Sequence, residues 1–492
     1  MSAETIVDCL ERHAHERPDA PAVLSSHRAV TYRELHARVG GCADWLRSYD
    51  VGSGERVGVS IADDLTHLVV ALGLASLGAA HTTLATHDAA PARSRLAART
   101  GVRRVVAASS EPRLPGLGLV TLDADRMAMW ARRAPTRLAR PDPSSLFTFF
   151  TTSGTTGEAK IIPIVHERIA HHAARVPAGR SLPLSTIEHY FAKRAFIFAI
   201  LAGSAVAIRE SPDQPVAPLC AALGVDVLVC MSAQARDLLA AAPRFGRLPP
   251  TTLLVLSGER VARPARRQFL EQLCDAVAVN YGTQESGSVA RVVERDPRTV
   301  TDTVGRPHAG VDVEIVDALG TPLPRGDVGE IRVRAPGMAP GYFDDDRATA
   351  RHFRDGWFQP GDLASFTPDG TLIVHGRADE VMNLNGIKIA PVEIERALER
   401  HPAVKAVAAF PLRSGVHGEI PVAAVELAEG ARADERELKS FARDALGLRA
   451  PRRVTIVAAL PVTLQGKVDR QRLAAMCAAP APPSGVASAP EA

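Results

Sequence analysis

Short apolar runs alternate with segments of helical periodicity over residues 30–280, and this alternation restricts the fold more than any other feature of the chain. A helical pattern at residues 31–48 is followed by an apolar run at 56–61, a second helical segment and a break at Gly78. Strands and helices in alternation are typical of βαβ units, whose parallel strands are buried on both faces. The pattern recurs at residues 103–108, 205–209, 225–231, 253–257 and 276–280. We therefore expect parallel sheets covered by helices.

The pattern changes twice further along the chain. Short strands separated by turns, at residues 311–316, 330–333 and 372–376, predict a small antiparallel or barrel-like part. A third region begins near Asp379 and combines helices at 390–401 and 435–446 with strands at 404–410 and 420–427. We expect an α/β fold with two domains and a tail. Residues 1–378 would form a large N-terminal domain of helix-covered β-sheets that includes the barrel-like part. Residues 379–477 would form a small, mobile α+β C-terminal domain, and residues 478–492 a disordered tail.

The composition excludes several classes of protein. The 492 residues are 46% apolar and 23% charged, which is enough for a large core and more than one domain. A net charge of +3 and an aromatic content of 4% disfavour nucleic-acid binding. The chain has no apolar leader and no run of about 18 uncharged apolar residues, so we expect a cytoplasmic protein without a transmembrane segment. Six scattered cysteines favour free thiols over disulfides or a zinc site.

Residues 151–160, TTSGTTGEAK, have the chemistry of a phosphate-binding loop. Two glycines permit unusual backbone conformations, hydroxyls and successive amides can converge on anionic oxygens, and Lys160 adds a compact positive charge. The lysine is informative because only six of the 58 basic residues are lysines. The loop is not a Walker motif, since Glu158 and Ala159 separate Gly157 from the lysine. A polar turn is the alternative for such a loop considered alone.

Three later segments could complete a nucleotide site. Residues 280–285, NYGTQE, place an aromatic ring and a carboxylate after a predicted buried strand, where ligands of open α/β sheets bind. Asp362 lies in a glycine turn and could accept hydrogen bonds from a diol, and Lys467 follows Gly466 in a turn near the C-terminus. Each segment also has a simpler interpretation: a half-buried aromatic at Tyr281, a turn-capping Asp362 and a solvated Lys467.

Eight segments, taken in order, resemble the motifs of the AMP-forming acyl-adenylating enzymes. This superfamily comprises acyl- and aryl-CoA ligases, stand-alone adenylation domains and luciferases. The resemblance extends from Thr31 to Leu473, and eight motifs in family order are far more specific than one. The segments are VTYRELHARV, GLASLGAAHTTLATH, TTSGTTGEAK, LLVLSGE, NYGTQESG, GWFQPGDLASFTPDG, GRADEVMNLNGIKIAPVEIERAL and LPVTLQGKVDRQRL.

The resemblance implies a role for each segment. The loop ending at Lys160 would hold the β- and γ-phosphates of ATP, Tyr281 would stack on adenine, and Asp362 would bind the ribose. Glu285 would hold Mg²⁺, and Lys467 would reach the carboxylate and α-phosphate from the small domain. The implied catalytic residues are Lys467, Glu285 and Lys160. The implied nucleotide-binding residues are Thr152, Ser153, Gly154, Thr155, Thr156, Gly157, Lys160, Asn280, Tyr281, Gly282, Gln284, Asp362, Arg377 and Lys467.

The resemblance also implies the reaction. A carboxylate would attack the α-phosphorus of ATP and release pyrophosphate, while Mg²⁺ and Lys467 stabilise the developing charge. A thiol of CoA or of a carrier-protein phosphopantetheine would then attack the acyl-adenylate. For this second step the small, mobile domain would rotate about a hinge at Asp379 and exchange Lys467 for the loop of Gly386, which borders the thiol tunnel. Arg377, beside the hinge, would contact ribose or phosphate.

The chain departs from the family pattern in two places. It has Ala159-Lys160-Ile161 where the family loop usually reads P-K-G, and Gln284 where the family has a threonine that donates to the α-phosphate. Glutamine can also donate, but its side chain is longer.

The acid substrate is the part of the function that the resemblance determines least. Family pockets draw on residues 184–198 and on the strands that end at Ser257 and Tyr281, which makes the candidate pocket residues Glu188, His189, Tyr190, Ser257 and Gly258. We expect an aryl or small-to-medium carboxylic acid; the alternatives are a fatty acid, or an amino acid whose ammonium meets Glu188. No carrier domain follows Lys467, so we expect CoA or a separate carrier protein as acceptor. A non-catalytic relative that binds adenylate is a further alternative, which Gln284 alone favours.

Overall fold

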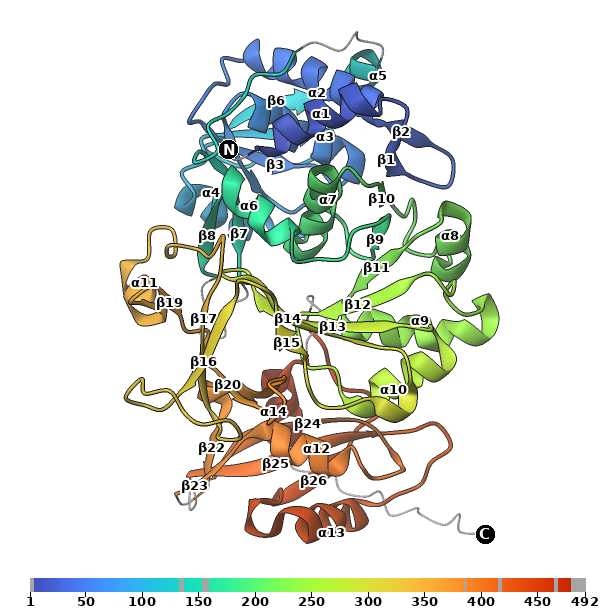
Figure 1. The fold of residues 1–492 in the computed structure, drawn as a ribbon, viewed down its shortest axis with the longest axis vertical. Coiled ribbons are helices and arrows are strands. Elements are labelled where there is room, and N and C mark those ends of the chain that lie inside the picture. The colour runs from blue at the N-terminus through green and yellow to red at the C-terminus, as the bar shows by residue number, and fades with distance from the viewer. Residues whose placement is uncertain are drawn as a thin grey trace, which may run out of the picture.

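The computed structural model describes residues 4–131, 137–152, 159–384, 386–414, 418–463 and 468–478. The described strands form four sheets, which succeed one another along the length of the molecule with helices packed against them (Figure 1). The prediction of an α/β fold with a large N-terminal part and a smaller C-terminal part is confirmed.

The first sheet contains the two strands that flank the predicted phosphate loop. Its strand order is β6-β5-β3-β4-β7-β8, and all neighbours are parallel except β7 and β8, which are antiparallel. The amide of Thr152 donates to the carbonyl of Lys160 (3.0 Å), so the two strands form a hairpin around the loop. The strands are β3 (Arg56–Ser60), β4 (Ala80–Thr83), β5 (Arg104–Ala108), β6 (Gly118–Leu122), β7 (Leu146–Thr151) and β8 (Ile161–Val165).

The second sheet is the largest and carries the segment that contains Tyr281. Its order is β15-β14-β13-β12-β11-β9-β10-β1-β2. The strands from β1 through β10, β9, β11 and β12 to β13 are parallel, and the pairs β1–β2, β13–β14 and β14–β15 are antiparallel. The strands are β1 (Pro21–Leu24), β2 (Ala29–Thr31), β9 (Ser181–Pro183), β10 (Val206–Ala207), β11 (Val227–Cys230), β12 (Leu253–Ser257), β13 (Val277–Thr283), β14 (Gly287–Glu294) and β15 (Arg306–Pro307).

The expectation of parallel sheets is therefore incomplete, because both sheets carry antiparallel pairs. A parallel neighbour needs a crossover connection of a dozen or more residues, whereas the turn between β13 and β14 comprises only residues 284–286. Gly282 permits the close approach of the two strands, since a Cβ there would lie 2.2 Å from the carbonyl oxygen of Gly287.

The third sheet is antiparallel, as its short strands predicted. Its order is β18-β19-β17-β20-β21, with β16 also paired to β17. Asp362 and Arg377 are opposite each other in the β20–β21 register. The strands are β16 (Asp312–Val316), β17 (Gly329–Arg334), β18 (Phe353–Arg354), β19 (Trp357–Phe358), β20 (Asp362–Phe366) and β21 (Leu372–Arg377).

The chain after Arg377 forms a sheet and a hydrophobic core of its own. A 3₁₀ turn, η2 (Ala378–Glu380), leads into a sheet of order β23-β22-β25-β24, with β26 parallel to β25. The core includes Met382, Ile394, Leu398 and Leu438, all fully buried. The strands are β22 (Met382–Leu384), β23 (Ile387–Ile389), β24 (Val404–Ser414), β25 (Gly418–Leu427) and β26 (Arg453–Ile456).

The helices cover the faces of these sheets. Local signals fix their ends: α2 begins with a capping box, in which the Thr31 hydroxyl accepts from the amide of Glu34 (3.2 Å) and Glu34 accepts from the amide of Thr31 (2.9 Å). The helices are α1 (Ile6–Glu16), α2 (Tyr32–Arg47), α3 (Asp64–Ser76), α4 (Ala90–Arg99), α5 (Ala124–Ala131), α6 (His166–Ala173), α7 (Tyr190–Ala202), α8 (Val216–Leu223), α9 (Ser232–Phe245), α10 (Arg263–Gln272), α11 (Asp346–His352), α12 (Pro391–Leu398), α13 (Glu435–Leu446) and α14 (Arg470–Ala478); two further 3₁₀ turns are η1 (Pro297–Thr299) and η3 (Gly447–Arg449). None of the described helices has the length and apolar character needed to cross a membrane.

Several predicted boundaries differ from the structure: the strand expected at 404–410 is β24, which extends to Ser414, and the strand expected at 276–280 is β13, which extends to Thr283. The helix expected at 390–401 is α12, which ends at Leu398, and Ala478, expected to begin a disordered tail, is the last residue of α14. Residues 479–492 lie outside the described residues.

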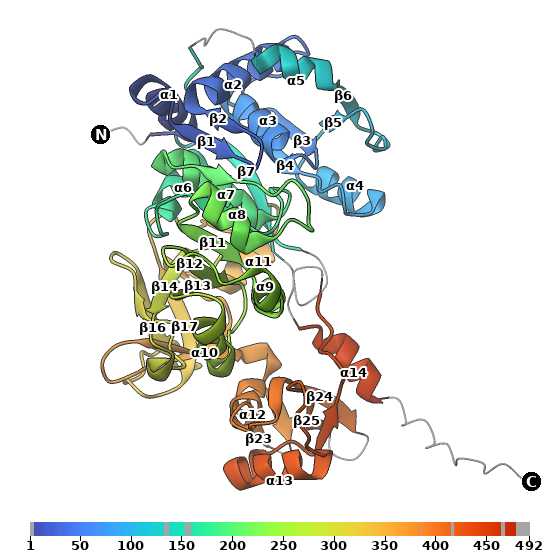
Figure 2. The same cartoon turned by 90° about the vertical axis from the view of Figure 1, so that its right-hand side faces the viewer.

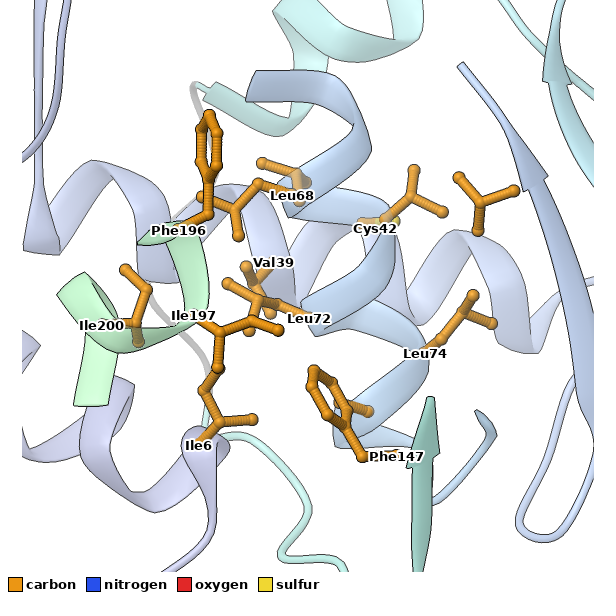
Figure 3. Packing of buried hydrophobic residues seen from close by; sticks show 14 of the residues in the cluster. Ile6, Val39, Cys42, Leu68, Leu72, Leu74, Phe147, Phe196, Ile197 and Ile200 are labelled. Carbon is orange, nitrogen blue, oxygen red and sulfur yellow. The ribbon is translucent and has the colours of Figure 1, made fainter. Parts of the chain in front are cut away.

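The largest core joins α7 to the first sheet. Phe196, Ile197 and Ile200 of α7 pack with side chains of α2 and α3 and with Phe147 of β7 (Figure 3). The helix is apolar except for two adjacent basic residues, Lys193 and Arg194. This core fixes α7 between the first two sheets, and it therefore fixes where the polar side chains of α7 lie.

Candidate active site

Tyr281, Asp362 and Arg377 converge from three strands of two sheets. Tyr281 lies near the end of β13, and its hydroxyl donates to Oδ2 of Asp362 (2.7 Å). Nη1 of Arg377 lies 3.5 Å from Oδ1 of Asp362 and donates to the carbonyl of Pro360 (2.6 Å). Among the described residues, the carboxylate of Asp362 thus contacts the side chains of Tyr281 and Arg377. It forms no hydrogen bond there that would cap its own turn, which was the simpler interpretation of this residue.

Burial and charge act in opposite directions on Asp362. Burial raises the pKa of its carboxyl, whereas the Tyr281 hydroxyl and the Arg377 guanidinium lower it. Burial, followed by the charge of Asp362, raises the pKa of Tyr281, which keeps the phenol neutral as a donor. The pair is a half-buried acceptor with a fixed donor beside it.

Glu285 and Lys160 lie in a second cluster. Glu285 is 6% exposed, and its Oε1 accepts from the hydroxyl of Tyr342 (2.8 Å). Lys160 Nζ lies 4.9 Å from the centre of the Tyr342 ring and 2.8 Å from Nε2 of His352. Because Nδ1 of His352 lies 2.8 Å from the carbonyl of Gln359 and donates to it, Nε2 is the acceptor for the ammonium. Lys160 is thus held just after the predicted phosphate loop.

Burial lowers the pKa of Lys160, and the carboxylate of Glu285 opposes that shift. Burial also lowers the pKa of His352, which favours its neutral form as acceptor. The cluster therefore combines a held cation with a carboxylate.

Gln284 connects the second sheet to the stem of the loop. Its Nε2 donates to the carbonyl oxygen of Thr151 (2.7 Å), and its Oε1 is buried without a hydrogen-bond partner among the described residues. Its side chain is thus packed against the last residue of β7. Gln284 takes part in joining the two sheets at this point.

The structure describes some of the remaining predicted nucleotide-binding residues and not others. Ser153, Gly154, Thr155, Thr156, Gly157 and Lys467 lie outside the described residues. Thr152 closes the β7–β8 hairpin through its amide, and Asn280 and Gly282 lie in β13.

The predicted hinge and tunnel residues lie on the C-terminal side of this cluster. The carboxylate of Asp379, in η2, accepts from Nε and Nη2 of Arg377 (3.0 and 2.9 Å), and these contacts lower its pKa. Gly386 is exposed, has a φ of 89° and lies in the turn of the β22–β23 hairpin. That hairpin lies in the lower part of the molecule, well apart from β7 and β8 (Figures 1 and 2). The structure therefore brings Asp379, but not Gly386, next to the nucleotide cluster.

A cavity of about 120 Å³ lies between α7 and the carboxyl ends of β11, β12 and β13. Two of the predicted pocket residues, Tyr190 and Ser257, line it, as do Asn280 and Gly282. Its wall is otherwise mostly apolar, which is typical of a small-molecule site.

The other predicted pocket residues are not among the described residues that line this cavity. Glu188 is 9% exposed and accepts from the amide and hydroxyl of Thr86 (2.7 and 2.8 Å). His189 stacks on His87 with ring centres 4.7 Å apart. Gly258 follows β12 with a φ of 97°. Tyr190, the first residue of α7, thus lines the cavity, whereas Glu188, two residues earlier, contacts Thr86.

The sequence did not indicate four residues of this region. Tyr342 and His352 are far from Glu285 and Lys160 along the chain, and no motif links them. Arg194 and Arg291 line the cavity. Arg194 lies in the segment that was expected to form the pocket, and a charged residue in an apolar helix is a signal that could have identified it.

Comparison with known families gives two matches. The family model "AMP-binding enzyme" matches residues 10–343, and "AMP-binding enzyme C-terminal domain" matches residues 393–467. The first match alone covers more than half of the chain.

Individual relatives are distant but cover nearly the whole chain. The chain is 28% identical to phenyloxazoline synthase MbtB of Mycolicibacterium paratuberculosis, over 96% of this chain and 42% of that protein. It is 27% identical to a salicylyl-CoA synthase / salicylate adenylyltransferase of a Streptomyces species, over 94% of this chain and 92% of the relative. The chain thus spans about two fifths of the length of the first curated relatives.

The fold is shared with the ATP-bound MatB of Rhodopseudomonas palustris. The TM-score is 0.83 at 23% identity, covering 96% of this chain and 98% of MatB. At this identity the likeness concerns the fold alone.

Proposed function

The chain belongs to the family of AMP-binding enzymes, and from that premise we propose that it activates a carboxylic acid with ATP and then transfers the acyl group to a thiol. The acid forms an acyl-adenylate with release of pyrophosphate. The acceptor is CoA or the phosphopantetheine of a separate carrier protein. CoA is supported by the relative that is named a salicylyl-CoA synthase. A carrier protein is supported by the match to part of a longer synthase.

The observation that carries the proposal is the convergence of the two clusters at the end of β13. Asp362 offers a half-buried carboxylate acceptor to a ribose diol, with Tyr281 beside it. Lys160, at the end of the predicted phosphate loop, offers a held cation close to the carboxylate of Glu285. An acceptor for sugar hydroxyls next to a cation for phosphates fits a nucleotide better than any other ligand class.

The donor set also fits one Mg²⁺ ion. Oε1 of Glu285 accepts from Tyr342, and among the described residues the carboxylate has no other hydrogen bond, so it can serve as an oxygen ligand. Mg²⁺ is usually held by one or two protein carboxylates together with substrate phosphates and water, so a single Glu285 is a sufficient protein contribution. When bound there, the ion would neutralise charge on the phosphate oxygens.

The chain's own residues perform the rest of the chemistry. The acid lies in the cavity lined by Tyr190, Ser257 and Asn280, and its carboxylate attacks the α-phosphorus while pyrophosphate leaves. Lys467 stabilises the charge on the oxygens around that phosphorus. The thiol then attacks the acyl carbon, the bond between that carbon and the adenylate oxygen breaks, and AMP leaves. No general base is needed for the first step because the nucleophile is already ionised.

We also propose the division of labour along the chain. Residues 1–378 bind ATP and the acid, and residues 379–477 form a lid that carries Lys467 and pivots at Asp379 between the two half-reactions. The separate core after Arg377 supports this division, because a unit with its own core can rotate as a body.

Pyrophosphate release tests the proposed function. Purified full-length protein, ATP and Mg²⁺ are incubated with a panel of carboxylic acids, with and without CoA, and products are identified by mass spectrometry. We expect acid-dependent pyrophosphate and AMP, and an acyl-CoA or an enzyme-retained acyl-adenylate. ATP that binds without any acid-dependent pyrophosphate would instead indicate a non-catalytic adenylate-binding protein.

A further inference from the structure

Two arginines line the cavity that is proposed to hold the acid. Arg194 comes from α7, and Arg291 comes from β14, where it is opposite Asn280 in the strand register. The Arg194 guanidinium carbon lies 5.1 Å from the centre of the Phe198 ring, so the side chain is held against the wall by a cation–π contact. Two cations in a mostly apolar cavity are more than a simple hydrocarbon acid requires.

A third arginine lies directly behind them. Arg175 is 9% exposed, and its Nη2 donates to the carbonyls of Ser286 and Pro336 (3.0 Å each). Arg291 donates in turn to the carbonyl of Arg175. Backbone oxygens thus orient these guanidiniums, but a carbonyl carries no charge to compensate theirs.

In the part of the chain that the structure describes, no ion pair joins any of these three arginines to a carboxylate. Nε of Arg291 and Nε and Nη1 of Arg175 are buried and without a hydrogen-bond partner among the described residues. By contrast, the buried Arg266 pairs with Glu294 at 3.1 Å. A desolvated guanidinium without a counter-ion is unfavourable, and the cavity is where an anion could reach Arg194 and Arg291.

Neighbouring titratable groups respond to the same positive charge. Burial first, then Arg291 and Arg175, lower the pKa of His308 to about 4. Burial first, then Arg194 and Arg175, keep the pKa of His172 well below its usual value. Burial, then Arg194, lower the pKa of Arg175 to about 10. The histidines stay neutral, so the field in the cavity comes from the arginines.

We propose that the acid activated by this enzyme carries a second anionic oxygen group, which Arg194 and Arg291 bind inside the cavity. The inference rests on the proposed function, because it assigns the substrate class of the same site. One carboxylate is left free to react with ATP, and the other group, a carboxylate or sulfonate, matches the planar donor fork of a guanidinium.

The size of the cavity limits the body that joins the two groups. Its volume of about 120 Å³ is close to that of a protein cavity of about 150 Å³ that holds benzene. A single ring or a short chain fits, whereas a long fatty acid does not. The two arginines would also repel an ammonium group, which disfavours an amino acid as substrate.

Matched pairs of acids test the proposal. Affinities are measured by calorimetry on the full-length protein for benzoate against the three benzenedicarboxylates and 4-sulfobenzoate, and for butanoate to hexanoate against the corresponding dicarboxylates. We expect at least one dianion to bind about tenfold tighter than its matched monoanion, a difference of about 1.4 kcal/mol. The carboxylate and sulfonate arms identify which group the arginines prefer.

Variants assign the preference to the arginines. Arg194→Gln and Arg291→Gln should each remove most of the preference for the dianion over its matched monoanion, and Arg194→Lys should retain part of this preference. The control is Arg267→Gln, at an exposed arginine of α10, which should leave the preference unchanged. Equal affinity for both members of every pair would overturn the proposal. So would an equal loss for monoanions and dianions in Arg194→Gln, because Arg194 would then bind the reacting carboxylate.

Pyrophosphate release from the same acids tests the proposed function separately from the affinity measurements. Dianions that bind in an arginine-dependent way without releasing pyrophosphate would contradict adenylation and leave the assignment of the pocket standing. Monoanions that are activated as well as dianions would contradict the substrate class and leave adenylation standing.

Discussion

Asp362 and Tyr281 make up the smallest unit of the site that can be tested alone. The carboxylate is half-buried, and its desolvation raises its pKa although Tyr281 and Arg377 oppose the shift. A carboxyl whose folded pKa lies above its unfolded value of about 3.9 stabilises the fold below that value. This contribution is lost as the pH rises through the folded pKa, so at neutral pH Asp362 is kept ionised at a cost in stability.

Asp362→Asn should therefore raise the melting temperature at pH 7.5 by more than it does at pH 4. It should also raise the KM for ATP by about tenfold, because an amide accepts hydrogen bonds from the ribose less strongly than a carboxylate does. The control is Asp369→Asn: that exposed carboxylate accepts from Thr367, which lowers its pKa, so its loss should give no gain in stability and no change in KM. An unchanged KM in a folded Asp362→Asn enzyme would contradict the ribose assignment.

Gln284→Glu tests the contact between the second sheet and the loop stem. A carboxylate cannot donate to the carbonyl of Thr151, and it adds negative charge where phosphates are proposed to bind. We expect a lower melting temperature and at least about a tenfold loss in kcat/KM for ATP, or about 1.4 kcal/mol. Stopped-flow measurement of pyrophosphate release with saturating acid gives kcat/KM for ATP. A value equal to that of the unaltered enzyme would mean that the phosphates bind elsewhere.

At the scale of elements, η2 is the link between the two cores. Asp379 is the second residue of this turn, a position where proline is tolerated because the first amides of a helical turn need no internal partner. Its carboxylate also forms the two-pronged contact with Arg377. A substitution here thus has two separable effects, one on the backbone and one on this ion pair.

Asp379→Pro should uncouple the half-reactions. A fixed φ holds the hinge in one arrangement, so we expect adenylate still to form and be retained, while transfer to a thiol falls by at least about tenfold. Asp379→Ala is the control, since it removes the ion pair and leaves φ free, and it should transfer normally. Single-turnover assays of each half-reaction with a melting curve separate the cases; a parallel loss of both with lower stability would exclude a hinge at this residue.

The elements also show what the sequence could and could not predict. The bounds of α13 and β12 agree with their patterns, because a strongly amphipathic helix and a short buried strand each have a local signal. β14 was not expected, since residues 284–286 were interpreted as part of a site and not as a turn between antiparallel strands. The contact of Tyr342 with Glu285 depends on packing between sheets, for which a single sequence gives no periodic signal.

At the scale of the whole molecule, charged contacts join α12 to the part of the chain before η2. Arg260 forms a two-pronged contact with Glu399, the residue directly after α12 (2.6 and 2.8 Å), and Arg396 of α12 lies 3.8 Å from Asp302. Arg396 donates to the carbonyl of Val374 (3.2 Å). These contacts hold the C-terminal unit in the arrangement of Figure 2.

Glu399→Gln should favour movement of the C-terminal unit, because it removes the charge that Arg260 pairs with. We expect faster proteolysis between residues 377 and 391 and a changed small-angle X-ray scattering profile. Arg449→Ala is the matched control: it breaks a contact with Glu393 of α12 (3.0 Å) that lies within the C-terminal unit. Equal behaviour of the two variants would show that the Arg260 contact does not restrain the movement.

The central claim is that a carboxylate oxygen of the acid becomes bonded to the α-phosphorus of ATP. The most direct measurement uses an acid with both carboxylate oxygens labelled with ¹⁸O, incubated with the enzyme, ATP, Mg²⁺ and a thiol, followed by mass spectrometry of the nucleotide and phosphate products. We expect AMP that carries one ¹⁸O and pyrophosphate that carries none, because thiol attack breaks the bond between the acyl carbon and that oxygen. ADP together with labelled orthophosphate, or unlabelled AMP formed alongside the thioester, would contradict it.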